Sequence, residues 1–473
     1  MSLVFFPLQN KRFNTDFSIL NDWTNKLQFF TGIDILMSVL WLIISIIILQ
    51  YIKSLNREKE HYKYYMWNFY FRLIFNLAFS FYFIYFVKGG DTVAYWDASV
   101  RLTNLLYLNP ENFFNELFQF QGSKDYVNYF NNITGIPPNW IAKEKEAYFC
   151  AKVFSFFNIF TNGSFFALSI ITTMISSIAS FHLFDFIKKS PLFSKSNLAV
   201  ISLFIPSVAF WCSGIGKDMI IYSVLCIMIP ILFTIGKEKQ RRFSRIIILI
   251  FCLYLLYNIR SFMILVIFLP LFFTYNVKIS EYLFQGKFAR QVFRILFVGL
   301  LLTSSALFIG NFASEQTKNA EIQQNDFNSN TYKGKKYSVG DADFSYSGIL
   351  KMSPFAIFAG ILRPLPWEAL TPGLIINGLE SLLIIFLAFR FFRKKSRLKL
   401  SILRNNDLLV YFIYFVLILA LITGITSVLF GVLVRVRAPL IPFVFLMLLI
   451  EIFEENTEDS TLITKSQSIH VSY

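Results

Sequence analysis

The chain has 473 residues, of which 55% are hydrophobic and only 15% are charged, and its formal net charge is +15. In a soluble protein of this length about a quarter of the residues are charged, so the composition excludes an ordinary soluble enzyme and favours a membrane protein. A positive net charge is also typical of proteins that bind nucleic acid, but the positions of the basic residues explain it otherwise.

Apolar segments follow one another along the whole chain, and several reach the roughly 20 residues that a helix needs to cross a bilayer. They are 33–52, 67–87, 164–187, 197–212, 219–235, 246–259, 262–277, 294–311, 373–390, 408–430 and 438–453. We therefore expect an all-α fold, a polytopic transmembrane bundle of about 11 helices over 33–453. An interfacial arm, 1–32, precedes the bundle, and the polar, acidic tail 454–473 follows it.

Lysine and arginine are concentrated after every odd-numbered apolar segment. The basic clusters lie within 53–63, 188–195, 237–245, 278–294 and 390–404. Because short cytoplasmic loops are the ones enriched in Lys and Arg, the pattern predicts a multi-pass protein of the inner (plasma) membrane, with its N-terminus outside and its C-terminus in the cytoplasm. It also accounts for most of the positive charge, so we expect membrane lipids and no nucleic acid among the partners.

Two long connections, 88–163 and 312–372, lie on the outer side in this topology and are predicted as its larger extracytoplasmic loops. The first contains glycine, proline and aromatic residues and is expected to fold with short helices. The second contains the polar stretch 314–345, which is typical of a mobile segment or of a lid.

Five short motifs with charged or aromatic residues lie in turns that the same topology places outside. They are 89–97, 211–218, 257–261, 363–368 and 435–437. Ionisable groups at the edge of a bilayer are costly unless they are paired or hydrated, which makes them candidates for function.

The chemistry of these motifs suits an anionic substrate. The cationic candidates for substrate binding are Lys217, Arg260, Arg363, Arg435 and Arg437, and the other candidates are Tyr95, Asp97, Asp218 and Trp367. Guanidinium groups bind phosphate oxygens through paired, charge-assisted hydrogen bonds. Asp91 and Glu368 are the candidate catalytic residues, since a carboxylate near such a site acts as a general base toward a hydroxyl acceptor. No histidine or cysteine spacing predicts a metal site, and no cofactor is expected.

Each motif also has a purely structural interpretation. Asp91 and Asp97 are residue types that cap helices. Lys217 and Asp218 are able to pair with each other, and Arg260 with another residue of the bundle. Arginines 435 and 437 are able to extend toward lipid headgroups instead of a substrate. Arg72, within the second apolar segment, is expected to pair inside the bundle.

This layout resembles bacterial membrane enzymes that use polyprenyl-phosphate-linked sugars. Residues 90–95, Gly-Asp-Thr-Val-Ala-Tyr, look like the start of the acidic first loop of GT-C glycosyltransferases. Four arginines match the essential periplasmic arginines of Wzy-type polysaccharide polymerases and O-antigen ligases. They are Arg260, Arg363, Arg435 and Arg437.

The resemblance implies a membrane glycosyltransferase or polymerase of envelope polysaccharide assembly, acting at the extracytoplasmic face. Its partners would be a lipid-linked sugar donor and a glycan acceptor. A transporter or flippase of a lipid-linked anionic glycan is the alternative, and a non-catalytic scaffold of an envelope complex is a third hypothesis.

Overall fold

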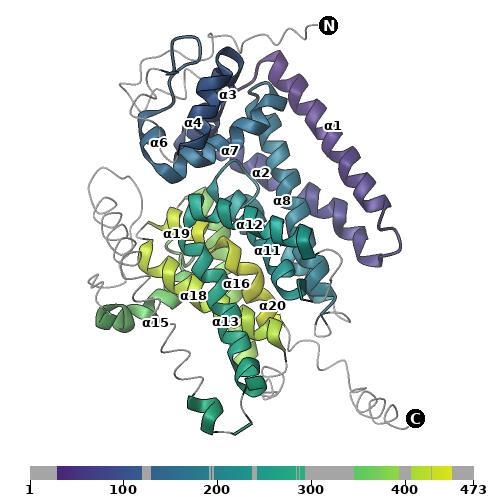
Figure 1. Ribbon diagram of the computed structural model, residues 1–473, viewed down its shortest axis with the longest axis vertical. Coiled ribbons are helices and arrows are strands. Elements are labelled where there is room, and N and C mark those ends of the chain that lie inside the picture. Colours follow the sequence, from purple (N-terminus) through teal and green to yellow (C-terminus); the bar gives the residue numbers. More distant parts are fainter. Residues whose placement is uncertain are drawn as a thin grey trace. The chain divides into compact units, whose positions relative to one another are not determined.

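A computed structural model describes most of the chain. The described residues are 29–119, 129–190, 193, 197–236, 242–283, 285–286, 288–292, 346–369, 371–393, 406–427 and 429–449. Within these ranges every regular element is a helix (Figure 1). Nine helical segments in the described part are long and apolar enough to cross a membrane. The all-helical, multi-pass class predicted from the sequence is therefore confirmed. The predicted segment 294–311 and the tail 454–473 lie outside the described residues.

The chain divides into two compact units. Unit 1 comprises 1–190 and 203–264, and unit 2 comprises 191–202 and 265–473.

Unit 1 contains five helical segments of membrane-spanning character. They are α1 (Gly32–Ser54), α2 (Tyr64–Phe81) with the flanking turns η3 (Glu60–Lys63) and η4 (Tyr82–Phe86), α8 (Phe165–Lys188), α11 (Lys217–Thr234) and α12 (Arg242–Arg260). Helix α1 begins with a capping box, in which Thr31 and Asp34 bond each other's backbone N–H. Reciprocal bonds of this kind satisfy two amides that the first turn of a helix leaves without partners.

Contacts between helix ends show which helices run in the same direction. The hydroxyl of Ser164, the N-cap of α8, donates to the carbonyl of Asp34 in the first turn of α1, so α1 and α8 begin at the same end of the unit. His61, just before α2, lies 2.7 Å from Asp185 in the last turn of α8. Helix α2 therefore begins where α8 ends and runs antiparallel to it.

Helices α11 and α12 are oriented by two further hydrogen bonds. Thr172, in the second turn of α8, donates to the carbonyl of Ser213 just before α11. Arg245, near the start of α12, donates to the carbonyl of Thr234 at the end of α11. Helix α11 thus begins near the start of α8, and α12 returns toward that end.

These directions separate the charged segments of unit 1. The motifs 89–97, 211–218 and 257–261 lie at the end where α8 and α11 begin, here called the motif end. The basic residues Arg57, Lys59, Lys188, Lys189, Arg242 and Arg245 lie at the opposite, basic end. Within unit 1 the structure therefore separates motifs from basic clusters in the way that the charge pattern predicts.

A helical cap covers the motif end of unit 1. It consists of α3 (Gly90–Leu108), α4 (Pro110–Phe118), α6 (Asn139–Lys143) and α7 (Lys145–Thr161), all from the segment between α2 and α8. Helix α3 packs along α7, which buries Trp96, Leu102 and Phe154. The first long connection is helical in its described part, as expected, but only α4 and α6 are short, while α3 and α7 have 19 and 17 residues.

Unit 2 is also helical. Its elements are α13 (Phe262–Leu283), which begins at the end of unit 1, α15 (Tyr346–Leu362), α16 (Pro372–Arg393), α18 (Asp407–Thr426), α19 (Phe430–Arg437), η6 (Ala438–Leu440) and α20 (Ile441–Leu449). Helix α15 is an apolar helix inside the connection 312–372, which the sequence analysis assigns to a loop. The predicted segment 197–212 forms two short helices, η5 (Asn197–Leu203) and α10 (Pro206–Trp211).

Helices α15 and α18 of unit 2 approach each other closely because each carries a small residue every fourth position. Ala356 and Gly360 on α15 face Ala420 and Gly424 on α18, and a Cβ atom on either glycine would overlap the facing backbone. Small residues at this spacing let membrane helices pack backbone to backbone. This contact gives the short helix α15 a defined place in the unit.

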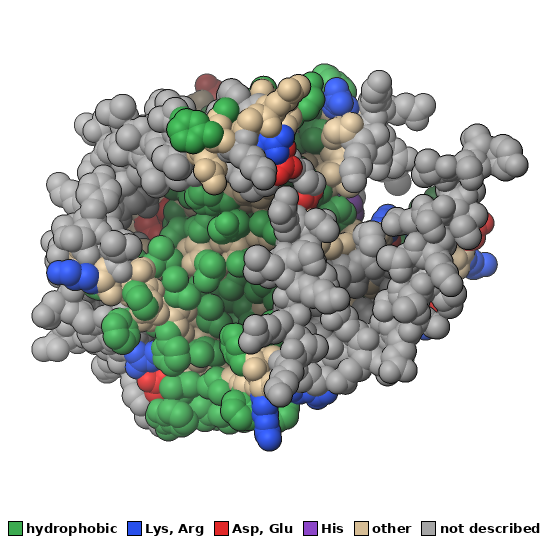
Figure 2. Space-filling view, turned by 90° about the horizontal axis from the view of Figure 1, so that it is seen from below, with side chains coloured by type: hydrophobic (Ala, Val, Ile, Leu, Met, Phe, Trp, Pro, Cys, Tyr) green, Lys and Arg blue, Asp and Glu red, His purple; other side chains and the backbone are tan. Residues whose placement is uncertain are grey.

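The spanning helices keep large apolar side chains exposed. Examples are Leu36, Ile47, Ile74, Phe251 and Phe386. Figure 2 shows such side chains gathered over one face of the protein. Contiguous apolar surface of this extent is rare on soluble monomers, whereas hydrocarbon solvates it.

Candidate functional site

The first motif begins with two glycines that the local backbone requires. Gly89 and Gly90 have φ of 131° and 76°. A Cβ on Gly90 would also lie 3.2 Å from the ring of Phe83. Only glycine adopts such angles without strain, so the pair turns the chain from η4 into α3. Asp91 follows in the first turn of α3, half-buried, where a carboxylate is favoured by the helix dipole.

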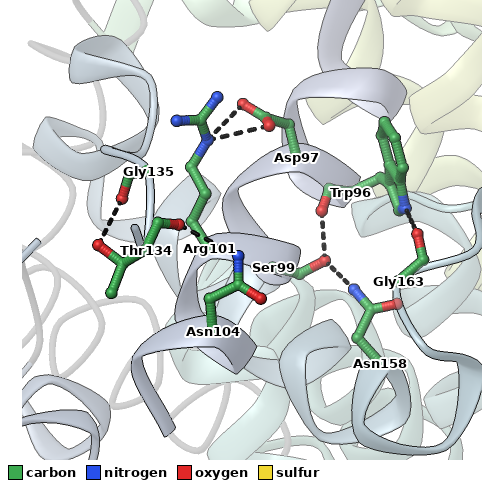
Figure 3. Close-up of polar contacts among 9 residues, drawn as sticks. All are labelled: Trp96, Asp97, Ser99, Arg101, Asn104, Thr134, Gly135, Asn158 and Gly163. Atoms are coloured by element: carbon green, nitrogen blue, oxygen red, sulfur yellow. Dashed lines mark hydrogen bonds and ion pairs between the residues drawn. The ribbon is translucent and has the colours of Figure 1, made fainter. Parts of the chain in front are cut away.

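Asp97 lies inside the cap instead of at a helix start, so the capping interpretation is wrong for this residue. Both of its carboxylate oxygens accept from Nε of Arg101, at 2.9 and 3.0 Å (Figure 3). Neither side chain has more than 1% of its surface exposed. Burial raises the pKa of Asp97, and Arg101 partly offsets this. The pair therefore belongs to the core of the cap.

The aromatic residues of the first motif are buried too. Tyr95 is 3% and Trp96 1% exposed. The indole N–H of Trp96 donates to the carbonyl of Gly163, and its ring packs against Phe165. Trp96 thus fixes α3 to the start of α8, and both rings are too deeply buried to stack on a sugar.

The second motif supplies a cation and an acid that each form an ion pair with a residue of another helix. Nζ of Lys217 lies 2.7 Å from Glu144 and 3.4 Å from Glu146, at the start of α7. Asp218 lies 2.8 Å from Nη1 of Arg260, the last residue of α12. The second and third motifs are thus joined by an ion pair, as the structural interpretation of Arg260 predicts.

These charges converge on one part of α7. Burial raises the pKa of the Cys150 thiol, and Asp91, Lys217, Asp218 and Arg260 all act on it electrostatically. Three motifs that are far apart in the sequence therefore meet at the motif end. We call Asp91, Glu144, Glu146, Lys217, Asp218 and Arg260 the motif-end cluster.

The fourth and fifth motifs meet in unit 2. Arg363 holds Glu368 through Nε, at 3.1 and 3.2 Å, and through Nη2, and Glu368 also accepts the N–H of Leu365. Arg437 is fully buried and donates to the carbonyls of Ile361 and Arg363. The headgroup interpretation is thus wrong for Arg437. Its contacts hold the 363–368 loop in place.

The remaining candidates of unit 2 are more open. Trp367 has 68% of its surface exposed, at the tip of the loop that Arg363 and Glu368 close. Arg435, in the last turn of α19, is half-buried. The 363–368 loop therefore presents one exposed aromatic ring, and its carboxylate is hydrogen-bonded to residues of the same loop.

Two members of the motif-end cluster, Glu144 and Glu146, are absent from the sequence-based candidates. They lie about half-exposed at the start of α7, with 51% and 44% of their side chains accessible. Their signal in the sequence is weak, because acidic residues in the first turn of a helix are ordinary. Only the fold brings them to Lys217.

Among the described residues no group of three or more His, Cys, Asp or Glu side chains is placed to hold a metal ion. No protein-family model, no curated protein and no solved structure matches this chain. Its functional interpretation therefore rests on the chemistry of its own residues.

Proposed function

We propose that this chain is a membrane glycosyltransferase or polysaccharide polymerase of the cell envelope. It uses a polyprenyl-phosphate-linked sugar at the extracytoplasmic face of the inner membrane. The observation that carries the proposal is the motif-end cluster, where Asp91, Lys217 and Arg260 meet beneath a helical cap, opposite the basic end. A lipid-linked donor presents its phosphate at the surface of the bilayer, where the ends of spanning helices lie.

Within the cluster, Asp91 is the base that deprotonates the acceptor hydroxyl, because it is half-buried at the start of α3. Lys217 and Arg260 stabilise the negative charge of the departing phosphate, a role in which preorganised donors act most strongly. The glutamates that pair with Lys217 are half-exposed, so a phosphate group is able to replace them.

Glu368 is the second candidate base, in unit 2. Its two carboxylate oxygens already accept hydrogen bonds from Arg363 and from the N–H of Leu365. A carboxylate stabilised in this way is a weaker proton acceptor. Asp91 is the preferred base because it lies in the same cluster as Lys217 and Arg260, and Glu368 serves to shape the loop that presents Trp367.

The test is the substitution Asp91→Asn in cells whose only copy of the gene carries it. Removal of a general base lowers turnover by about a hundredfold or more, so polymerised or transferred glycan should be lost while the protein level in the membrane stays normal. Glu111→Gln is the matched control, because Glu111 is an exposed acid on α4 of the same cap. Normal glycan in the Asp91→Asn strain would remove Asp91 from the mechanism.

One observation favours transport of a lipid-linked anionic glycan as a second candidate. Arg72 is fully buried within the span formed by η3, α2 and η4. Transporters place charged or polar binding groups near the middle of the bilayer. Purified protein in vesicles that moves a fluorescent polyprenyl diphosphate sugar between leaflets, with no chemical conversion, would establish this candidate and overturn the enzyme.

A further inference from the structure

Arg72 is a cation inside a membrane span whose partners are all uncharged. Its Nε donates to Asn68 at 3.2 Å, Nη1 to Ser176 and Ser213 at 3.0 and 3.3 Å, and Nη2 to Tyr222 at 3.0 Å. Its guanidinium also lies 5.0 Å from the centre of the Tyr222 ring. No other part of the described chain pairs with it. Ionisable residues held within a span in this way are costly and mark functional regions.

The partners of Arg72 belong to four different parts of unit 1. Asn68 is on α2 itself, Ser176 is on α8, Tyr222 is on α11, and Ser213 is in the turn that leads into α11. A planar guanidinium with five N–H donors in a fixed fork bridges several elements at once, which a lysine ammonium does not do. The bond to Ser213 connects the interior of the span to the 211–218 motif.

The same turn is fixed by the residues around Arg72. The hydroxyl of Ser176 donates to the carbonyl of Cys212 at 2.6 Å, and that of Thr172 to the carbonyl of Ser213 at 2.9 Å. Gly214 is pressed against α2, since a Cβ there would overlap the ring of Phe79. The turn is therefore held from α2 and α8, and Lys217 and Asp218 begin α11 directly after it.

Arg72 also acts electrostatically on the same thiol as two members of the motif-end cluster, Asp218 and Arg260. Burial raises the pKa of the Cys212 thiol, Asp218 raises it further, and Arg72 and Arg260 oppose the rise. Arg72 and Asp218 thus act on the same thiol in opposite directions.

From these contacts we propose that Arg72 is a positioning residue for the motif-end cluster. Its guanidinium fork holds the 211–218 turn so that Lys217 meets α7 and Asp218 meets Arg260. The inference rests on the proposed function only in the experiment that measures sugar transfer. The position of the turn is measurable without any substrate.

Cys212 is a native reporter of the turn, because its thiol is fully buried. Cys252, which is buried on α12, is the internal control. Purified protein in detergent is treated with N-ethylmaleimide, and alkylation of each cysteine is followed by peptide mass spectrometry. In Arg72→Gln, Cys212 should react about tenfold faster or more, as loss of charged hydrogen bonds predicts, while Cys252 is unchanged.

Three further variants separate the fork from the charge. Arg72→Lys keeps the charge and loses the fork, so it should behave like Arg72→Gln. Ser213→Ala, in which Arg72 is intact, should also make Cys212 react faster. Tyr222→Phe leaves the contacts of the turn in place, so Cys212 should react as slowly as in the wild type. The proposal would be overturned if Cys212 in Arg72→Gln were alkylated as slowly as in the wild type, or if all four cysteines became reactive together. If Arg72→Lys restored the slow alkylation of the wild type, the positive charge alone would account for the effect.

An activity measurement then distinguishes the two proposals. With a polyprenyl diphosphate sugar as donor, Arg72→Gln should raise KM for the donor more than it lowers kcat, because Lys217 is displaced and Asp91 is not. If the wild-type protein converts no donor, the proposed function fails while the Cys212 result stands. If Asp91→Asn is inactive and Arg72→Gln leaves both Cys212 and KM unchanged, the inference about Arg72 fails alone.

Discussion

Arg260 at the end of α12 and Asp218 at the start of α11 form an ion pair 2.8 Å long, with 16% and 4% of their side chains exposed. Breaking such a pair by removing one partner leaves a buried charge and costs about 3 kcal/mol or more. Arg260→Gln should therefore lower the free energy of unfolding by about that amount. Adding Asp218→Asn should recover part of the loss, which a double-mutant cycle of denaturant unfolding in detergent will measure. Additive losses would show that the two residues do not interact.

Lys217 should contribute to donor binding more than to stability. Its partners Glu144 and Glu146 are half-exposed, and solvent-screened pairs contribute about 1 kcal/mol or less. We expect Lys217→Gln to unfold nearly like the wild type and to raise KM for a polyprenyl diphosphate donor. Glu144→Gln serves as the matched control, since it removes the pair and keeps the cation. An equal KM in both variants would argue against phosphate binding by Lys217.

Lys152 should make the stability of the cap depend on pH. Burial on α7 lowers its pKa to about 8. Because the folded protein then loses this proton at lower pH than the unfolded chain, stability rises with pH from about 8 toward the usual lysine value, by up to about 1.4 kcal/mol per pH unit. Lys152→Met should remove this rise in thermal melts across pH 7–10 and raise stability at pH 7. The exposed Lys143→Met should retain the rise.

The sequence predicts the helical class and the two ends of unit 1, because both depend on local composition. A helix that crosses the hydrocarbon core needs a long apolar run, and the basic loops alternate with the other loops along the chain. Both features are therefore visible in the sequence without knowledge of tertiary contacts. The motifs 89–97, 211–218 and 257–261 are correctly expected to share one end, and the structure brings them together around Cys150.

Long-range partners are not predictable in this way. Glu144 and Lys217 are 73 residues apart, and nothing near either residue indicates the other. Asp97 looks like a helix cap in the sequence, but α3 extends from Gly90 to Leu108, so Asp97 lies inside the helix. There it pairs with Arg101, one turn further along. Helix α15 is missed because it has only 17 residues, with Pro354 inside and Lys351 near its start.

The α15–α18 contact of unit 2 should not tolerate a single added methyl group. A Cβ at Gly424 would overlap the carbonyl of Ala356, so Gly424→Ala is expected to destabilise the protein by about 1–3 kcal/mol, the usual cost of overpacking. Gly431 on α19 has no atom within 4 Å of the same added group. Gly431→Ala should be neutral or stabilising, by about 1 kcal/mol, because alanine favours a helix. Thermal melts in detergent that rank the two variants in the opposite order would contradict this packing.

Sidedness decides whether the motif-end cluster is able to meet an extracytoplasmic substrate. Lys143 adjoins Glu144 in the cap, Arg57 lies at the basic end, and both are exposed. The four native cysteines are all buried, so they give little background to thiol labelling. A membrane-impermeant maleimide added to intact spheroplasts should label Lys143→Cys, and should label Arg57→Cys only after permeabilisation, because basic loops remain in the cytoplasm. The reverse pattern would place Asp91 in the cytoplasm, where the proposed donor headgroup is not presented, and the sugar-transfer mechanism would fail.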